Sequence, residues 1–333
     1  MKKYDRRIVV ITRETRLEKA LIRHNTRAQA KFYINSLGGD FDDYDAEHRQ
    51  YHASVREARQ CLEEMGNLQI LDRKYLPNFI FAPEDIAVAI GQDGLVANTI
   101  KYLNAQPIVG VNPDPNRWDG VLLPFAPKDA AKIVEDVIKG RRKTEEVTMA
   151  KASVQNGQEL LAVNDLFIGQ RTHVSARYII KHGEIKESQS SSGVIVSTGL
   201  GSTGWMKSVI AGALRICASS IIDEYLKEPA TGAASNTSNT QDRRYDFSEL
   251  SSAIGKWKSE ELIFSVREPF PSKTTGANLV FGKVSADKPL RIESLMGENG
   301  VIFSDGMESD FLAFNSGVEA TIALADKRGH IVV

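Results

Sequence analysis

The sequence contains only two cysteines, Cys61 and Cys217, and neither belongs to a CxxC pair. This scarcity argues against a disulfide framework and against a zinc knuckle built from closely spaced thiols. Cys217 lies among apolar neighbours, so we expect it to be a small core residue rather than a reactive thiol.

Long apolar runs are also missing. The N-terminal run from Ile8 to Ile11 is too short for the core of a signal peptide. No stretch approaches the about 20 apolar residues that a membrane-spanning helix needs. We therefore expect a cytoplasmic protein with no membrane partner.

Neither sign of charge is in excess. The chain has 42 basic and 43 acidic residues, and a formal net charge of -1. This balance argues against a broad electrostatic contact with nucleic acid. The 333 residues are enough for two domains with sizeable cores.

The first part of the chain alternates between strand-like and helix-like patterns. Short apolar runs predict strands at 8–12, 68–72, 86–90 and 107–111, and longer patterns predict helices at 15–34, 44–65 and 127–140. This alternation predicts an α/β domain over residues 1–142, with a doubly wound, mostly parallel sheet.

The charged stretch GRRKTEEVT marks the predicted domain boundary. Residues 143–333 consist mainly of short alternating runs separated by turn signals, which predict a β-rich domain. A helical pattern interrupts them at about 205–226, and the small polar residues of 228–244 predict a mobile loop.

Two histidines, His48 and His52, are one helical turn apart in the second long polar helix. Such a pair is able to bind a metal ion, but the sequence spacing places no third ligand beside it. An exposed polar helix is therefore the favoured interpretation, and the metal ligands of this protein stay unassigned.

The stretch IAVAIGQDGLVANTI is the most informative part of the sequence. A buried-strand pattern ends in Gly91-Gln92-Asp93-Gly94, and a helical pattern follows at once. A glycine turn before a helix N-terminus suits a phosphate-bearing ligand, because glycine permits close approach and the first amides of a helix are unpaired. A carboxylate repels phosphate, so Asp93 fits a base that accepts a hydroxyl proton.

A second strand–glycine–helix junction is formed by the residues TGLGSTGW, at 198–205. It lacks the lysine of a Walker-type phosphate loop, and its hydroxyls and backbone amides suit a sugar or a ring better than a bare phosphate. Asn164-Asp165 interrupts an otherwise apolar strand, either as a strand end or as ligand contacts. Asp305-Gly306 is typical of a hairpin turn.

Together, these motifs resemble those of the NAD kinase family. GQDGL matches the GGDGT turn of that family, Asn164-Asp165 matches its Asn-Glu pair, and TGLGST matches its TGxGST turn. The segments GVNPDP, FIGQRTHVSARY and SDGMESDFLAFNSGVEA resemble the mitochondrial-type branch. The resemblance covers nearly the whole chain.

The resemblance implies that an α/β domain and a β-rich domain together transfer the γ-phosphoryl of ATP to the 2′-hydroxyl of the adenosine ribose of NAD. The reaction uses a divalent metal, expected to be Mg²⁺, and relatives of the mitochondrial type are expected to form homodimers. Asp93 would be the catalytic base, and Gly91, Gln92 and Gly94 would shape the turn around phosphates. The substrate-binding residues would be Asn164, Asp165, Ser202, Thr203, Gly204, Trp205 and Ser208.

Four motif positions depart from the family pattern: Gln92, Leu95, Asp165 and Leu200. If position 92 requires a left-handed backbone, glutamine there costs on the order of 1–2 kcal/mol. Leu95 and Leu200 each remove a hydroxyl that is able to contact a ligand. These departures leave two alternatives open, a kinase of another hydroxylated acceptor such as a sugar or lipid, and a catalytically silent dinucleotide-binding protein.

Overall fold

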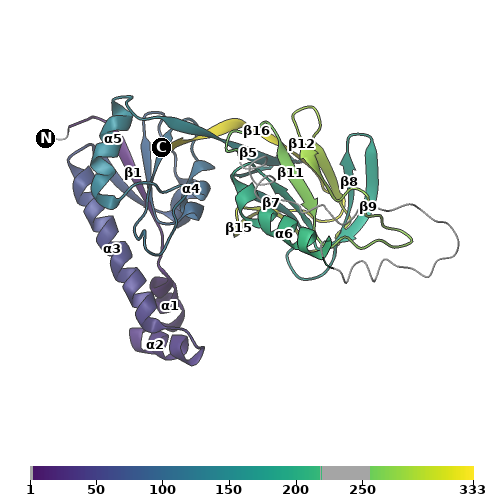
Figure 1. Ribbon diagram of the computed structural model, residues 1–333, viewed down its shortest axis with the longest axis horizontal. Helices are drawn as coiled ribbons and strands as arrows, with labels where there is room; N and C mark the ends of the chain where they lie inside the picture. Colours follow the sequence, from purple (N-terminus) through teal and green to yellow (C-terminus); the bar gives the residue numbers. More distant parts are fainter. Residues whose placement is uncertain (1–2, 218, 220–255) are drawn as a thin grey trace. The chain divides into compact units, whose positions relative to one another are not determined.

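The computed structural model describes residues 3–217, 219 and 256–333 (Figure 1). The chain divides into two compact units: one runs to Val147 and also includes Lys327–Val333, and the other is Thr148–Asp326. The last residues of the predicted second domain thus return to the first unit. The predicted loop at 228–244 and the predicted helix beyond residue 219 lie outside the described residues.

The first unit is built on a parallel sheet. Its strand order is β2-β1-β3-β4, followed by the C-terminal end of β16, where His330 lies opposite Pro107. The strands are β1 (Arg7–Thr12), β2 (Asn67–Asp72), β3 (Ile86–Ile90), β4 (Pro107–Val111) and β16 (Glu319–Val332). The predicted doubly wound parallel sheet is therefore confirmed.

Helices cover both faces of this sheet (Figure 1). On one face, α3 (Phe41–Glu63) and α5 (Ala130–Ile138) pack on alternate strand residues such as Ile8 and Val10. On the other face lies α4 (Asp93–Ile100), which follows β3 directly. Strands buried on both faces read as continuous apolar runs, which explains the sequence of β3.

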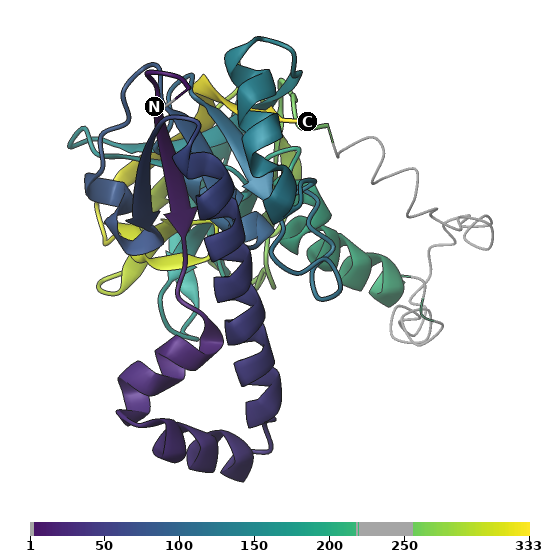
Figure 2. The ribbon, with the colours of Figure 1, turned by 90° about the vertical axis from the view of Figure 1, so that its left-hand side faces the viewer.

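A helical arm projects from the strands of the first unit (Figure 2). It consists of α1 (Arg16–His24), α2 (Arg27–Ser36) and the N-terminal part of α3, held by a small cluster of Leu17, Ala30 and Phe41. The single helix predicted at 15–34 is broken after α1, where Asn25 takes a positive φ of 62° and Thr26 caps α2 by accepting the amide of Gln29.

The second unit contains two β-layers. In one, β16 pairs with β13 (Leu290–Ser294), followed by β8 (Ala176–His182) and β9 (Ile185–Ser191), while β5 (Thr144–Val154) pairs with β16 and β6 (Glu159–Ala162). The other is an antiparallel sheet of β12 (Phe281–Val284), β11 (Leu262–Val266), β10 (Val194–Ser197), β7 (Asp165–Gln170), β14 (Gly300–Ser304) and β15 (Met307–Ala313). Apolar side chains of both layers, including Tyr178 and Phe264, share one core. The predicted β-rich unit is confirmed.

One expectation about a cysteine is wrong. Cys217 is exposed at the last residue of α6 (Trp205–Cys217). The helix packs through Met206 in its first turn, against Phe167 and Ile195, so the apolar neighbours of Cys217 do not enclose it.

In the part of the chain that the structure describes, no helix is both long and apolar enough to cross a bilayer.

Candidate functional site

The polar turn of the first unit lies where the chain direction across the sheet reverses. From β1 the chain passes to β2 on one side, and then returns to β3 on the other side of β1. In open parallel sheets, ligands bind outside the carboxyl ends of the strands at this reversal. The C-terminal ends of β1 and β3 carry Arg13 and Gly91-Gln92-Asp93 at this edge.

Asp93 is the first residue of α4 and is partly exposed. Its Oδ1 accepts a hydrogen bond of 2.7 Å from the backbone N–H of Leu122, which fixes the orientation of the carboxylate. Its Oδ2 accepts no hydrogen bond from the residues that the structure describes. That oxygen is therefore available to a hydroxyl of a ligand at the helix N-terminus.

The turn residues around Asp93 are less strained than the sequence suggested. Gln92 has φ −119° and ψ 162°, which is extended backbone, so the expected penalty for a left-handed residue is absent. A Cβ on Gly91 would lie 2.9 Å from the side chain of Leu95. A Cβ on Gly94 would meet nothing within 4 Å, so this glycine leaves open space beside Asp93.

Two of the departures from the family pattern fall in the core. Leu95 is 1% exposed and Leu200 is 6% exposed. Their side chains pack inside the protein, and the loss of a ligand contact at either position stays a prediction. A leucine at either position gains apolar burial.

Arg13 is a candidate that the sequence interpretation missed. Its Nη2 donates to Glu47 Oε1 at 3.0 Å, its guanidinium lies 5.0 Å from the ring centre of Tyr51, and its side chain is only 10% exposed. The Nε atom is buried without a hydrogen-bond partner and lies beside Gly91. In the sequence, Arg13 is marked as a candidate only by its position directly after a buried strand.

In the second unit, the structure brings Asn164-Asp165 and the glycine turn together. The backbone N–H of Thr198 donates to the carbonyl oxygen of Asn164 at 2.9 Å, and a Cβ on Gly201 would overlap the same oxygen. Ser197 lies opposite Asp165 in the pairing of β10 with β7. Asn164 therefore lies in the short connection between β6 and β7, and Asp165 is the first residue of β7. This confirms the interpretation of a strand end.

The Asp305 carboxylate organises this loop. It accepts the backbone N–H groups of Val163, Asn164 and Asp165 at 3.1, 2.6 and 3.2 Å. Asp305 and Gly306 form the turn between β14 and β15 with φ values of 52° and 69°, as the hairpin prediction requires. The sequence did not indicate that the same aspartate would hold the Asn164 loop.

The hydroxyls of the glycine turn have different environments. Ser202 is buried and donates to the carbonyl of Gly199 at 2.7 Å, so it stabilises the turn itself. Thr203, Gly204 and Ser208 are exposed, and the Thr203 hydroxyl donates to Leu200 at 3.0 Å. These three predicted contact residues are therefore accessible to a ligand.

Trp205 forms one wall of a hollow of about 340 Å³ in the second unit. Its ring stacks on Phe167 with 5.7 Å between centroids, and the Arg267 guanidinium lies 5.4 Å from the indole centre. Phe303 and Phe311 also line the hollow. Aromatic walls beside a cation suit a planar ring with a polar substituent.

Among the described residues of this unit, Asp165 is the carboxyl group whose pKa is shifted most. Burial raises its pKa from 3.8 to about 7, the Ser197 hydroxyl opposes that rise, and the negative charge of Asp305 adds to it. Its Oδ1 is buried without a hydrogen-bond partner. A ligand that donates a hydrogen bond there would stabilise the ionised form.

Comparison with known proteins gives consistent results for sequence and for fold. Over 129 residues the chain is 31% identical to the NAD kinase of Chlorobium luteolum, and over 153 residues it is 28% identical to the NAD kinase of Tropheryma whipplei. These matches cover 37% and 43% of this chain. Over these residues the chain is similar in sequence to NAD kinases. No family model matches the sequence.

Solved members of the NAD kinase fold align along almost the whole chain. An NAD kinase from Archaeoglobus fulgidus in complex with ATP matches with a TM-score of 0.53 at 17% identity, covering 98% of this chain and 93% of that one. Yeast NADH kinase in complex with NADH matches with a TM-score of 0.54 at 12% identity, covering 99% and 84%. At such identities the likeness establishes the fold.

The sequence matches to the NAD kinase family are partial. They span 44% of the length of the Chlorobium protein and 50% of the Tropheryma protein. They do not distinguish the branches of the family, so the mitochondrial-type assignment stays a prediction, as do the individual site residues.

Proposed function

We propose that this protein is an ATP-dependent kinase that phosphorylates the 2′-hydroxyl of the adenosine ribose of NAD and forms NADP. The observation that carries the proposal is Asp93, which stands at a helix N-terminus on the reversal edge of a parallel sheet with one carboxylate oxygen open. The relation to NAD kinases supports the choice of acceptor.

Asp93 acts as the base in this proposal. Its carboxylate accepts the ribose proton as the 2′-oxygen bonds to the γ-phosphorus of ATP and the bond from that phosphorus to ADP breaks. The hydrogen bond from Leu122 N–H holds Oδ1, so that Oδ2 faces the hydroxyl. Phosphoryl transfer depends mainly on positioning and on neutralising charge. Gly91, Gln92 and Gly94 shape the turn that receives the phosphates, and the buried Arg13 adds positive charge beside it.

The dinucleotide would be bound by the second unit. Asn164 and Asp165 would contact the adenosine half, where the unpaired Oδ1 of Asp165 accepts a donor from the base or ribose. Thr203, Gly204, Trp205 and Ser208 would line the nicotinamide half. Ser202 would act indirectly, by closing the turn that presents Thr203.

The phosphoryl donor would be ATP with Mg²⁺. A relative of the same fold was solved in complex with ATP. Magnesium is commonly held through substrate phosphates and few protein carboxylates, so the ion would arrive with the nucleotide. A homodimer stays a prediction of the family resemblance.

The test is NADP formation by the purified full chain with ATP, Mg²⁺ and NAD. Asp93→Asn keeps the shape of the side chain and removes the base, so turnover should fall by about 10²–10⁴-fold. Asp287→Asn, at an exposed turn of the second unit, is the matched control and should retain wild-type turnover.

The outcomes separate the alternatives. Turnover that persists in Asp93→Asn refutes the role of this carboxylate. Binding of NAD by the wild-type protein without turnover indicates a catalytically silent dinucleotide-binding protein. ATP hydrolysis or binding without any binding of NAD indicates a kinase of another acceptor.

A further inference from the structure

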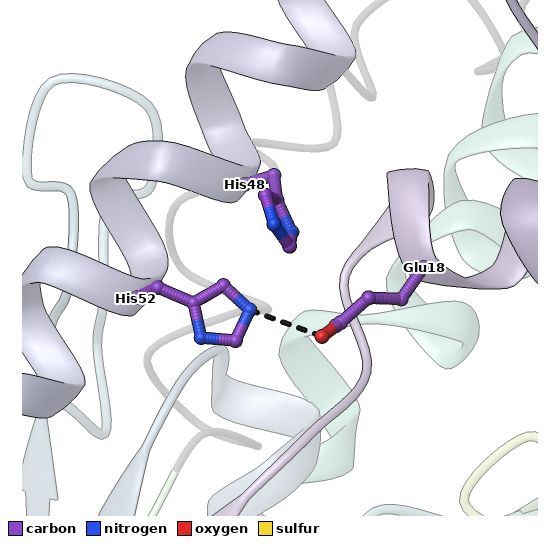
Figure 3. A group of neighbouring side chains, drawn as sticks. All are labelled: Glu18, His48 and His52. Carbon is purple, nitrogen blue, oxygen red and sulfur yellow. Dashed lines mark hydrogen bonds and ion pairs between the residues drawn. The ribbon is translucent and has the colours of Figure 1, made fainter. Parts of the chain in front are cut away.

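Three potential metal ligands meet in the helical arm, on elements that the proposed kinase site does not use (Figure 3). His48 and His52 lie one turn apart on α3, and Glu18 faces them from α1. Their ligand atoms all lie within 4.8 Å of one another, and the two imidazole centroids are 4.4 Å apart. The third ligand missing from the sequence pattern is thus supplied by a different helix.

Thr15 connects the first histidine to the glutamate. His48 Nδ1 is 2.9 Å from Thr15 Oγ1, and that hydroxyl is 3.0 Å from Glu18 Oε2. The hydroxyl has one proton. If it donates to the carboxylate, His48 must donate its Nδ1–H to Thr15. That tautomer leaves the lone pair of His48 Nε2 free, and it is the support that metal-binding histidines commonly have.

The second histidine shares one proton with the glutamate. His52 Nε2 lies 3.0 Å from Glu18 Oε1, as the dashed line in Figure 3 shows. A cation that enters between these two atoms displaces that proton: a neutral His52 then carries its proton on Nδ1, whereas a doubly protonated His52 releases one proton to solvent. Both atoms then become ligands. The two oxygens of Glu18 therefore have separate tasks: Oε2 bonds to Thr15, and Oε1 faces the histidines.

The group is accessible from solvent. It lines an open hollow of about 860 Å³, together with Gln50, Arg49 and Arg56. The side chains of His52 and Glu18 are 37% and 32% exposed. Arg49 opposes a cation, but its guanidinium is already paired with Asp45 at 3.2 Å. An ion can thus reach the group without opening the fold, and water can complete its coordination.

We infer that Glu18, His48 and His52 form a binding site for a divalent transition metal ion of the Zn²⁺ type. Two imidazoles and one carboxylate are a donor set that zinc accepts, with a water molecule in the fourth position. Zinc bonds of about 2.0–2.1 Å place tetrahedral ligands about 3.4 Å apart. Ligand atoms that are up to 4.8 Å apart must therefore move closer, while His52 Nε2 and Glu18 Oε1, at 3.0 Å, move slightly apart. The ion then joins α1 to α3 and fixes the arm.

The test uses Co²⁺ as a coloured substitute for Zn²⁺. Metal-free full-length protein is titrated with Co²⁺, and the visible absorption of four-coordinate cobalt is expected to saturate at one ion per chain. Zn²⁺ should then displace Co²⁺ and remove the band. Absence of any four-coordinate band refutes the site.

Variants assign the ligands. Glu18→Gln, His48→Gln and His52→Gln should each weaken binding by more than the about 10–100-fold that loss of a supporting partner costs. His24→Gln is the matched control, because His24 belongs to the same arm but stacks on Tyr33 outside the group. Unchanged binding in both His48→Gln and His52→Gln means that Glu18 and His52 form an ion pair only.

A second pair of variants tests the role of Thr15 independently of the ligands. Thr15→Ser keeps the hydroxyl and should bind Co²⁺ as the wild type does, whereas Thr15→Val should bind about 10–100-fold more weakly. Far-ultraviolet circular dichroism shows whether α1 and α3 still form in each variant. Equal binding by folded Thr15→Ser and Thr15→Val refutes the proposed support of His48.

Discussion

Replacing Asp165 by asparagine should stabilise the protein at alkaline pH and have less effect at acidic pH. Burial raises the pKa of this carboxyl group in the folded state from 3.8 to about 7. Between these two values the folded chain holds a proton that the unfolded chain has released. Stability is therefore lost as the pH rises from the unfolded pKa through the folded pKa. Asparagine has no proton to lose there.

The size of the effect follows from the pKa difference. One pKa unit corresponds to about 1.4 kcal/mol, so a rise from 3.8 to about 7 costs at most about 4 kcal/mol at pH 8. About 2–3 kcal/mol of that cost develops between pH 5 and pH 8. The free energy of unfolding of Asp165→Asn relative to wild type should rise by about this amount between the two pH values.

Urea unfolding at pH 5 and pH 8 measures this difference. Trp118→Phe in both proteins leaves Trp205 and Trp257, so that fluorescence reports on the second unit. Asp287→Asn is the control, because it makes the same change at an exposed carboxylate. A stability difference for Asp165→Asn that is the same at both pH values would show that the folded protein does not hold this proton.

Three variants test the packing and the backbone conformation of the two glycine turns. Gly201→Ala should lower the free energy of unfolding by about 1–3 kcal/mol in urea titrations, because its methyl group would overlap the carbonyl oxygen of Asn164; wild-type stability would mean that the turn shifts freely. Gly94→Ala should raise the free energy of unfolding by about 0.5–1 kcal/mol, because Gly94 lies in a helix and a Cβ there would meet no other atom within 4 Å. The same variant should form NADP more slowly, because its methyl group occupies the side where the phosphates approach. Unchanged turnover would argue against that approach. Gln92→Gly should lower stability by about 0.4–1 kcal/mol, because the extended backbone of residue 92 needs no glycine, and a gain in melting temperature would contradict this.

The sequence predicted the strands of the first unit closely, because each is a short apolar run buried on both faces. For the second unit, the prediction of strands from the sequence was less complete. The strands β9, β12 and β15 were not predicted, since polar residues such as those of IKESQSS do not produce a clear apolar alternation. The sequence predicts two separate runs, EATIALA at 319–325 and HIVV at 330–333, but both belong to the single long strand β16.

The candidate site was predicted only in part. Glycine turns and an isolated acid are local patterns, so Asp93 and the 198–205 turn could be found from spacing. Arg13, Asp305 and Glu18 are far in sequence from the residues that they contact, and no local pattern marks them. The backbone angle of Gln92 and the burial of Leu95 depend on tertiary packing, which motif comparison does not reveal.

The course of β16 has a consequence for biosynthesis. Its last residues pair with β4, and Val332 enters the core beneath α3 and α5. The first unit therefore lacks an edge strand and part of its core until the entire second unit has been translated. During synthesis, β4 therefore has one edge without a hydrogen-bonding strand until β16 is made. Such an exposed edge favours aggregation. A fragment that ends near Val147 should share this exposure, so the two units should be produced as one chain.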